Sequence, residues 1–375
     1  MKKRIAIIGS GIGGLTAANL LIKNSDIEII VYEKEKMLSL DEGYGIQLAP
    51  NSISILNKIG FRNIDKNDIF NPLKLNFYSN NNKICDLDLG KFNNESIKYT
   101  TLQRSTLIEF LKDKLFTNNF RFGKEVKKVS KIKDKLLINF SDNTNDFVDF
   151  IIVSDGVFSN TKSIIENKVI KPLYNGSIAI RTVIKFSEEF NYESKNISLI
   201  MSSNSHLVLY PINQRKEINL VCVVRKKLGD IRPTEKLLNS TFLKEHKHFA
   251  NFFKEDLKSW NIYTSLKPFK SKYKNVIYVG DAFFAFPPTM AQGASQAIES
   301  ANEIFELLTQ NHMDIENEYF KNRVKKTNLI KKRSKINYFA FHISNPLLKV
   351  LRNGLLKRLV KNKNFINTYL GRIYR

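Results

Sequence analysis

The chain opens with the stretch Ile5-Ala6-Ile7-Ile8-Gly9-Ser10-Gly11-Ile12-Gly13-Gly14. The apolar residues before the first glycine are long enough for one buried strand. Gly9 permits a tight turn, Gly11 lets the backbone approach a pyrophosphate, and Gly14 lets the following helix pack closely on the strand. The free N–H groups and the dipole at the start of that helix attract a phosphate. This order predicts a dinucleotide site in a Rossmann-like α/β domain.

A second apolar run covers residues 27–32 and ends at Glu33, which stands 19 positions after Gly14. A carboxylate at such a spacing accepts hydrogen bonds from a ribose 2′-hydroxyl. Because Glu33 fits a free hydroxyl, NADP is not expected at this site. The alternative is a glycine-rich turn in an ordinary α/β domain, but the full order of strand, glycines, helix, strand and acid favours a nucleotide. The motif does not separate NAD from FAD.

The last third of the chain contains a second glycine motif. Residues 276–279 predict a strand that leads into Gly280-Asp281. Ligands collect at the carboxyl ends of such strands, where the Asp281 carboxylate can accept a hydrogen bond from a ribityl hydroxyl. Gln292-Gly293-Ala294 opens a helix whose free N–H groups would face the polar edge of an isoalloxazine. A solvated Asp and an ordinary helix start are the alternative for this segment alone. Together, the two motifs predict an extended FAD.

With these motifs the chain resembles the class A flavoprotein monooxygenases, which are FAD-dependent aromatic hydroxylases of the para-hydroxybenzoate hydroxylase type. The resemblance covers most of the chain and is strongest to the salicylate-hydroxylase-like branch. Beside the N-terminal fingerprint, the matching blocks are Gly43-Tyr44-Gly45-Ile46 with Pro50-Asn51, Arg104-Ser105-Thr106-Leu107, Asp155-Gly156 with Ser159, Gly280-Asp281 with Pro288 and Gln292-Gly293, and the strand at 205–211. The resemblance implies an FAD site formed by Gly9, Gly11, Gly14, Glu33, Lys34, Arg104, Val126, Asp155, Asp281, Pro288, Gly293 and Ala294.

The chain departs from the family pattern at two places. The family usually has Arg a few residues after the Asp-Gly motif, where this chain has Lys162. Lysine keeps the charge but lacks the planar fork, so the bidentate contact of the arginine is not expected here. The late family motif reads Gly-Asp-Ala-Ala-His, and here Phe283 and Phe284 replace its last two residues. Any role of that His is therefore absent, and the two rings predict a more apolar pocket.

Few residues are candidates for chemistry on a substrate. A phenol benefits from a base, and His206 and Tyr210 share one face if their segment is a strand. They are the catalytic candidates, with a buried sheet histidine and a core tyrosine as the alternative. Arg181 can hold a substrate carboxylate as a fork, or form a cross-sheet ion pair instead. Phe284 and Gln292 complete the predicted substrate pocket. The histidines show no spacing that predicts a metal site.

The resemblance implies an enzyme that binds FAD tightly and NADH or NADPH transiently, without a second glycine-rich motif. In this family reduced flavin reacts with O2 to a C4a-hydroperoxide, which hydroxylates an aromatic or quinone-precursor ring. The protein must exclude water so that the oxidant does not decay to peroxide. Two alternatives stay open. One is a non-oxygenating FAD-dependent oxidoreductase of related fold, of the polyisoprenoid reductase or cyclase type. The other is a flavin-bearing binding protein.

The order of strands and helices predicts an α/β chain with two interleaved domains. We expect a Rossmann-like FAD-binding domain from residues 1–70, 99–166 and 274–310, a β-sheet substrate domain from 72–97 and 170–268, and a basic C-terminal helical segment from 311–375. Residues 147–153 are expected to form one strand that leads into Asp155. Alternating apolar residues indicate further strands at 178–186, 206–211 and 218–224.

The composition fits a globular protein with two cores, because 375 residues with 42% hydrophobic residues can bury that much surface. The two cysteines, Cys85 and Cys222, lie in no disulfide-like or metal-like spacing. Buried free thiols suit a reducing compartment, so a cytoplasmic location is expected. No apolar run reaches the length of a membrane-spanning helix.

The positive charge is concentrated near the C-terminus. The formal net charge is +24, and residues 321–375 contain sixteen Lys or Arg and no Asp or Glu. Within this segment Leu347, Leu348, Leu351, Leu355, Leu356 and Leu359 recur at helical spacing among basic residues. Such a helix can lie on an anionic membrane surface. In the alternative, the apolar stripe packs on the protein and the basic face is solvated. Nucleic-acid binding is not expected, because no nucleic-acid-binding motif accompanies the charge.

Overall fold

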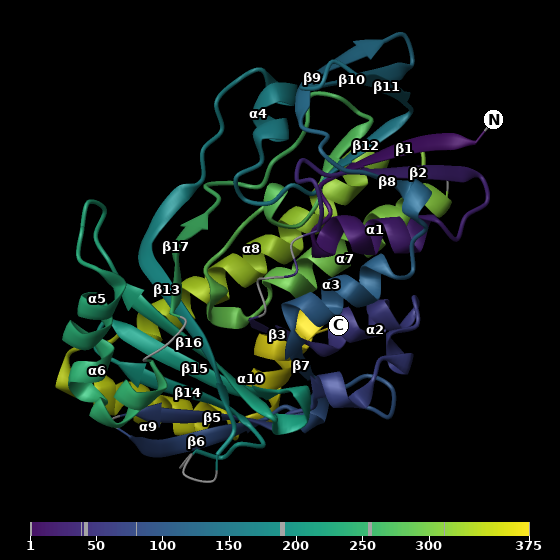
Figure 1. Ribbon diagram of the computed structural model, residues 1–375. Helices are drawn as coiled ribbons and strands as arrows, with labels where there is room; N and C mark the ends of the chain where they lie inside the picture. The colour runs from purple at the N-terminus through teal and green to yellow at the C-terminus, as the bar shows by residue number, and fades with distance from the viewer. Residues whose placement is uncertain are drawn as a thin grey trace.

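The computed structural model describes residues 2–38, 40, 44–79, 81–187, 192–253, 257–310 and 312–374. A parallel sheet lies at one end of the molecule and a large, mainly antiparallel sheet at the other (Figure 1). The long helix α8 (Ile315–Phe341) runs between the two ends (Figure 1). The predicted α/β fold with a separate β-sheet part and a C-terminal helical segment is confirmed.

The parallel sheet is the Rossmann-like part of the chain. Its strands, in spatial order, are β18 (Val276–Tyr278), β12 (Phe150–Val153), β1 (Lys3–Ile8), β2 (Ile27–Tyr32) and β8 (Phe120–Arg121). The central strands are buried along nearly their whole length, as expected for a sheet covered on both faces. The helices that belong to this part are α1 (Ile12–Leu21), α3 (Arg104–Lys112), α4 (Asn160–Glu166) and α7 (Gly293–Thr309).

The prediction of one strand over residues 147–153 is wrong. The segment divides into β11 (Asn145–Val148) and β12, because the chain bends at Asp149. The Asp149 carboxylate accepts the N–H of Arg4 at 2.8 Å, and the Asp149 N–H donates to the Arg4 carbonyl at 2.8 Å. β11 pairs instead in a small antiparallel sheet with β10 (Lys135–Phe140) and β9 (Val126–Ile132).

The seven-stranded sheet packs on two short helices with one face, and its other face is turned toward the elements around the parallel sheet. Its strands, in order, are β17 (Lys258–Thr264), β13 (Leu173–Lys185), β16 (Glu217–Arg225), β15 (Ser205–Ile212), β14 (Ile197–Ser202), β5 (Lys74–Ser79) and β6 (Asn82–Asp88). One face packs on α5 (Thr234–Ser240) and α6 (Phe242–Glu245). On the other face, Tyr210 and Ile212 share a buried cluster with Met290, from the loop before α7.

A three-stranded sheet joins the two large parts. It consists of β3 (Gly45–Leu48), β7 (Thr100–Gln103) and β4 (Ile69–Phe70), and α2 (Pro50–Asn57) follows β3. The Thr101 hydroxyl donates to the Pro211 carbonyl of β15 at 2.5 Å. On the other side, the Ala49 N–H donates to the Ser295 hydroxyl of α7 at 3.4 Å. These contacts fix the start of α7 relative to the seven-stranded sheet.

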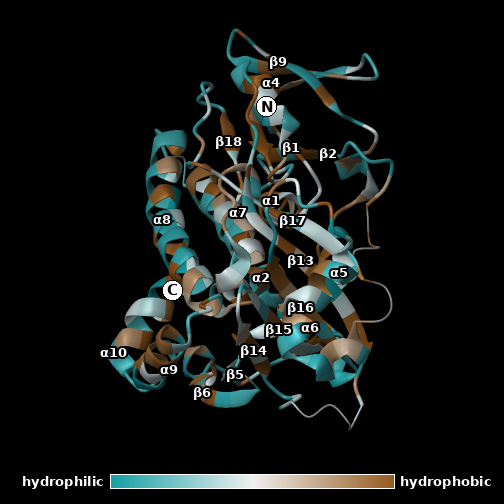
Figure 2. Cartoon of the chain, turned by 90° about the vertical axis from the view of Figure 1, so that its left-hand side faces the viewer, coloured by the Kyte–Doolittle hydropathy of each residue, from teal (hydrophilic) through white to brown (hydrophobic). Residues whose placement is uncertain are grey.

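The C-terminal part is helical and lies along the outside of both sheets. After α8 come α9 (Pro346–Leu359), α10 (Lys363–Ile366) and α11 (Arg372–Tyr374). The Asn345 side chain accepts the Leu348 N–H and caps α9, while Pro346 occupies its first turn. Figure 2 shows hydrophobic strands inside the molecule and a mixture of hydrophobic and hydrophilic residues on α9 at its edge. No helix among the described residues is long and apolar enough to cross a membrane.

Candidate active site

The strand order of the parallel sheet collects the predicted cofactor residues at one edge. Parallel strands end at the same edge of a sheet, and ligands bind there. Asp281 follows β18, Asp155 follows β12, Gly9 follows β1 and Glu33 follows β2. Residues that lie far apart in the sequence therefore line one edge in the order Asp281, Asp155, Gly9, Glu33.

The three fingerprint glycines have different surroundings. Gly9 has a φ of +98°, and a Cβ atom there would lie 2.9 Å from the Asp155 Cα. A Cβ atom on Gly14 would lie 2.1 Å from the Gly9 carbonyl oxygen. By contrast, a Cβ atom on Gly11, at the start of α1, would meet no atom within 4 Å. Two glycines are thus required for packing, whereas the space beside Gly11 fits a pyrophosphate at the helix N-terminus.

Glu33 is held in place by the glycine-rich turn itself. Its carboxylate accepts the Ser10 N–H at 2.9 Å, the Ser10 hydroxyl at 2.6 Å and the Glu35 N–H at 3.0 Å. A carboxylate fixed in this way is oriented before a ribose arrives. The neighbouring Lys34 is exposed and lies 3.7 Å from the Glu35 carboxylate.

Lys162 lies between two acids of the cofactor edge. Its ammonium donates to the Ala282 carbonyl at 2.7 Å and is nearly completely buried. Burial lowers the pKa of Lys162, while the charges of Asp155 and Asp281 raise it. The lysine that replaces the family arginine therefore joins α4 to the loop after β18.

Burial also changes the two carboxylates. Desolvation raises the pKa of Asp155, whose Oδ1 is buried and has no hydrogen-bond partner among the described residues. Desolvation raises the pKa of Asp281 to about 6, and the charge of Lys162 opposes this shift. Asp281 is nevertheless exposed to solvent. An unpartnered buried acceptor and an exposed carboxylate at the ends of neighbouring strands fit the polar part of a flavin cofactor.

Two further predicted FAD contacts do not follow a strand of the parallel sheet. Arg104 begins α3, and its N–H donates to the Tyr44 carbonyl at 2.8 Å. Val126 begins β9 with a buried side chain, so only its backbone remains for a contact. Gly43, which belongs to a predicted motif, lies outside the described residues.

The loop before α7 and the first turn of α7 contain the remaining predicted cofactor residues. Pro288 is exposed, and Ala291 has a φ of +50°. Gln292 is buried and precedes the first turn of α7, where Gly293 is exposed and Ala294 is half-buried. Nε2 of Gln292 is buried without a partner among the described residues, and its Oε1 accepts the Gln296 amide at 3.1 Å.

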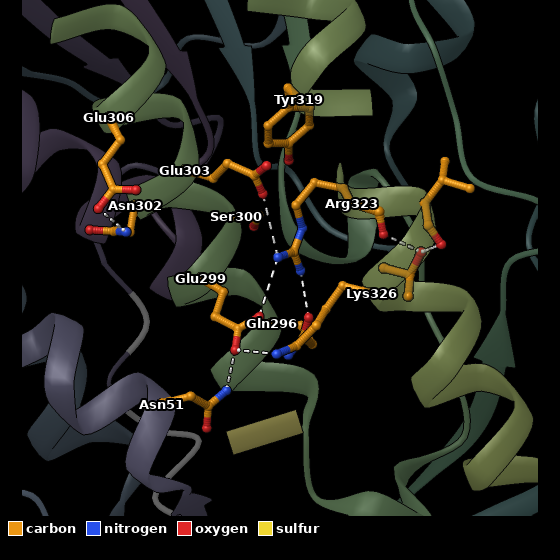
Figure 3. Close-up of polar contacts among 12 residues, drawn as sticks. Asn51, Gln296, Glu299, Ser300, Asn302, Glu303, Glu306, Tyr319, Arg323 and Lys326 are labelled. Atoms are coloured by element: carbon orange, nitrogen blue, oxygen red, sulfur yellow. Dashed lines mark hydrogen bonds and ion pairs between the residues drawn. The ribbon is translucent and has the colours of Figure 1, made fainter. Parts of the chain in front are cut away.

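A buried arginine of α8 contacts several side chains in the first half of α7. Arg323 of α8 donates to Oε1 of Gln296, and its guanidinium lies 3.2 Å from Glu299 and 3.6 Å from Glu303 (Figure 3). Lys326 lies 3.4 Å from Glu299 on the other side (Figure 3). The network fastens α8 to α7 and orients Gln296. Glu299, Glu303, Arg323 and Lys326 also line an outer pocket between α2, α7 and α8.

On the seven-stranded sheet, polar and aromatic side chains gather opposite the flavin-domain elements. The Arg181 guanidinium lies 5.6 Å from the Trp260 ring centre, and Trp260 meets the Tyr44 ring edge-on at 5.1 Å. Asn219 is completely buried and accepts the Gly45 N–H at 2.8 Å. A Cβ atom on Gly45 would come within 2.8 Å of both Asn219 and Tyr210, so glycine is needed there.

These side chains leave donors without partners. Nε of Arg181 and Nδ2 of Asn219 are both buried and unpaired within the described part of the chain. Burial raises the pKa of Tyr210, and the charge of Arg181 opposes the shift. Tyr210 is therefore a neutral phenol near pH 7. Buried donors without partners are costly, so such a cluster indicates a place for an acceptor-bearing ligand.

His206, the other catalytic candidate, lies on the same face as Tyr210 but has a different neighbour. Its Nδ1 is 2.7 Å from Nε2 of His342, and both rings are buried. Desolvation lowers the pKa of His206, so the ring is neutral near pH 7. The geometry gives His206 a structural partner, and its catalytic role stays a prediction.

The two phenylalanines of the late motif point to different surroundings. Phe283 packs edge-on against Tyr319 and Phe320 of α8. Phe284 lies 6.1 Å from Phe286 in the core, with the Lys331 ammonium 5.1 Å from its ring centre. Both side chains are buried, whereas the neighbouring Phe286 is half-buried, and the pocket role of Phe284 stays a prediction.

Sequence reasoning did not select Asn219 or Trp260. Asn219 is a single amide inside the apolar run of residues 218–224, and a buried amide in such a strand needs a partner. Trp260 is the only tryptophan of the chain. Each residue is therefore unusual in the sequence, but only the pairing of the strands shows that Asn219 lies beside Tyr210 and Trp260 beside Arg181.

Comparison with known proteins agrees with this geometry. A family model described as FAD binding domain matches residues 2–312. The chain is 23% identical to 3-amino-4-hydroxybenzoate 2-monooxygenase PtmB3 of Streptomyces platensis, over 94% of this chain and 92% of that protein. It is 25% identical to 6-hydroxynicotinate 3-monooxygenase of Bordetella bronchiseptica, over 92% and 94% of the two chains.

Solved structures show the same fold. Klebsiella pneumoniae HpxO, complexed with FAD and uric acid, superposes with a TM-score of 0.86 at 19% identity, over 99% of this chain and 96% of HpxO. A salicylate hydroxylase substrate complex gives 0.75 at 18% identity, over 100% and 97%. The chain therefore belongs to the FAD binding domain family, and within it to the class A flavoprotein monooxygenases. It is an FAD-dependent monooxygenase of the aromatic hydroxylase type.

Proposed function

We propose that this enzyme hydroxylates a small aromatic or quinone-precursor ring at the expense of NADH or NADPH. One oxygen atom of O2 enters the ring as a hydroxyl group, and the other leaves as water. The nicotinamide supplies two electrons and one proton as a hydride, and solvent supplies the second proton. The relatives support this choice, since their names specify hydroxybenzoates and a hydroxynicotinate as substrates.

The observation that carries the proposal is the set of buried donors without partners. Arg181, Asn219 and Gln292 each present a buried N–H group that no described residue accepts. A phenolate, carboxylate or ring carbonyl would satisfy them, with the Arg181 guanidinium providing charge. Trp260 and Tyr44 provide flat apolar surface beside that charge. This combination suits a planar, electron-rich ring with an acidic substituent.

The cofactor site divides into parts with separate tasks. The start of α1 with Gly11 would hold the pyrophosphate, Glu33 the adenosine ribose, and Asp155 with Asp281 the polar groups of the flavin half. Bound flavin would supply hydride acceptance and O2 activation. Tyr210 is protonated near pH 7, as an ordinary tyrosine is, and burial raises its pKa further, so it would act as a hydrogen-bonding group toward the ring. The buried side chains around it exclude water.

We assign residues 1–70, 99–166 and 274–310 to FAD and residues 72–97 and 170–268 to the substrate.

Oxygen balance tests this function. Purified, FAD-loaded protein would be mixed with NADH or NADPH in air, with and without 6-hydroxynicotinate, salicylate, 3-amino-4-hydroxybenzoate, 3-hydroxybenzoate or a quinone precursor. Faster nicotinamide oxidation, with matching O2 uptake and little peroxide, supports hydroxylation. Nicotinamide oxidation without O2 uptake would indicate a non-oxygenating oxidoreductase instead. Flavin that neither nicotinamide reduces would indicate a binding protein.

A further inference from the structure

The outward face of α9 is apolar although nothing in the described chain covers it. Five apolar residues are exposed to between 44% and 69%: Leu347, Leu348, Val350, Leu351 and Leu355. Their spacing of three and four residues places them on one side of the helix. Packing of the whole apolar stripe on the protein, the alternative weighed from the sequence, does not hold for these side chains.

The opposite face of α9 fastens the helix to the seven-stranded sheet. Arg352 is buried and donates to the Ser79 hydroxyl at 2.9 Å and to the Ala340 carbonyl at 3.1 Å. Leu356 and Val360 pack against the buried cluster that contains Ile366. The apolar face is therefore presented by an ordered, docked helix, so no folding step has to precede its use.

Basic groups border this apolar face. Lys357, Arg358 and Lys361 are exposed at the C-terminal end of α9. Beside the helix lies a pocket of about 420 Å³, to which Lys83, Lys349 and Lys357 contribute together with the polar Ser79, Asn82 and Asn353. Lys83 pairs with Glu193 and Asp86, and Lys349 lies 3.9 Å from Glu245. Residues 321–375 contain no acidic residue, so Lys357, Arg358 and Lys361 have no carboxylate in their own segment.

We propose that α9 docks the enzyme on an anionic lipid bilayer. The leucines would enter the boundary between headgroups and acyl chains, and the lysine and arginine side chains would meet lipid phosphates and carboxylates. A second copy of the chain fits this face less well, because a two-fold contact would bring the positively charged borders of both copies into one interface. The proposal is independent of the substrate, since α9 lies outside the cofactor edge.

Vesicle sedimentation with the full-length, FAD-loaded enzyme tests the proposal. Vesicles of phosphatidylcholine alone are compared with vesicles that also contain about one third phosphatidylglycerol. We expect binding to the anionic vesicles, at least a tenfold weaker interaction with neutral vesicles, and release as the salt concentration rises.

Matched variants separate the contributions of the face. L347S/L351S/L355S should reduce vesicle binding at least tenfold, while L228S/I231S, which changes apolar residues exposed elsewhere, should not. K357Q/R358Q should weaken binding to anionic vesicles, whereas K127Q/K128Q on β9 should leave it unchanged. Bound flavin, read from the visible spectrum, reports that each variant is folded.

Three results would overturn the proposal. The first is wild-type protein that stays in the supernatant with anionic vesicles. The second is equal loss of binding in the L228S/I231S control. The third is a dimer in solution that the triple serine variant dissociates, because this would identify a second copy as the occupant of the face.

Discussion

Gln296 donates its side-chain amide to Oε1 of Gln292, 3.1 Å away, at the start of α7. This contact fixes the direction of the Gln292 amide and leaves its buried Nε2 without a partner among the described residues. Arg323 in turn donates to Oε1 of Gln296, so a residue of α8 sets the orientation of both amides. The Nε2 donor of Gln292 is thus positioned by Gln296 and Arg323, although neither of these would contact the ligand itself.

This relationship predicts graded losses of activity. Gln292→Leu removes the donor, and we expect kcat/KM to fall about 100-fold. Gln296→Met removes only the positioning contact, and a fall of about 10-fold is expected with FAD binding unchanged. Asn302→Ala is the matched control, because Asn302 lies on the same helix and bonds to Lys58 and Glu306. Equal activity of Q296M and wild type would show that the orientation of Gln292 does not matter.

The Ser10–Glu33 contact predicts the strength of FAD binding. Removing the carboxylate with Glu33→Ala should raise the Kd of FAD about 10- to 100-fold, since hydrogen bonds to a charged group contribute roughly 1.5–3 kcal/mol. Ser10→Ala should have a smaller effect in the same direction, because the carboxylate loses one of its holding contacts. Fluorescence titration of the apoprotein measures both. Glu35→Gln, on an exposed neighbour, should bind FAD like wild type.

If Arg181 binds the substrate, the enzyme should prefer negatively charged substrates to uncharged ones. Arg181→Gln should raise KM for an aromatic acid about 10- to 100-fold and change KM for an uncharged phenol much less. Arg225→Gln is the control, since Arg225 is on the same sheet and also lies near an aromatic ring, 5.5 Å from that of Tyr338, but is exposed. If R181Q raises KM equally for charged and uncharged rings, Arg181 serves the architecture of the sheet and not the recognition of an anion.

The strands and the helix around the glycine-rich turn could be predicted from the sequence because each of them is local. The strand before Gly9, the helix after Gly11 and the acid after β2 depend on neighbours a few residues away. The substrate side depends on register between distant strands, and no local pattern places Asn219 beside Gly45. The strand break at Asp149 was missed for the same reason, since its cause is the contact with Arg4. Likewise, helical spacing identified the apolar stripe on α9, but it did not show which side of the helix packs on the rest of the protein.

The fingerprint glycines predict two different kinds of failure. Gly14→Ala would place a Cβ atom 2.1 Å from the Gly9 carbonyl oxygen, so we expect a loss of about 3 kcal/mol or more in the free energy of unfolding. Gly11→Ala meets no protein atom, so the variant should fold with nearly wild-type stability but bind FAD weakly. Thermal unfolding of the apoproteins, followed by FAD titration, separates the two. Normal FAD affinity in G11A would exclude close approach of a phosphate at this residue.

The buried His206–His342 pair predicts a loss of stability in acid. Desolvation lowers the pKa of both rings in the folded protein, while the unfolded chain takes up protons near pH 6.5. The stabilisation is therefore complete above about pH 6.5 and falls as the pH decreases, by about 1.4 kcal/mol per pH unit for each histidine that stays neutral. H206L/H342F should have a shallower decline of Tm between pH 7 and 5 than wild type, whereas His312→Gln, at an exposed site, should follow wild type. Turnover of H206L/H342F at pH 8 also tests the catalytic prediction for His206. Retained kcat assigns the pair to stability, whereas a loss of kcat in folded, FAD-loaded protein would return His206 to the reaction.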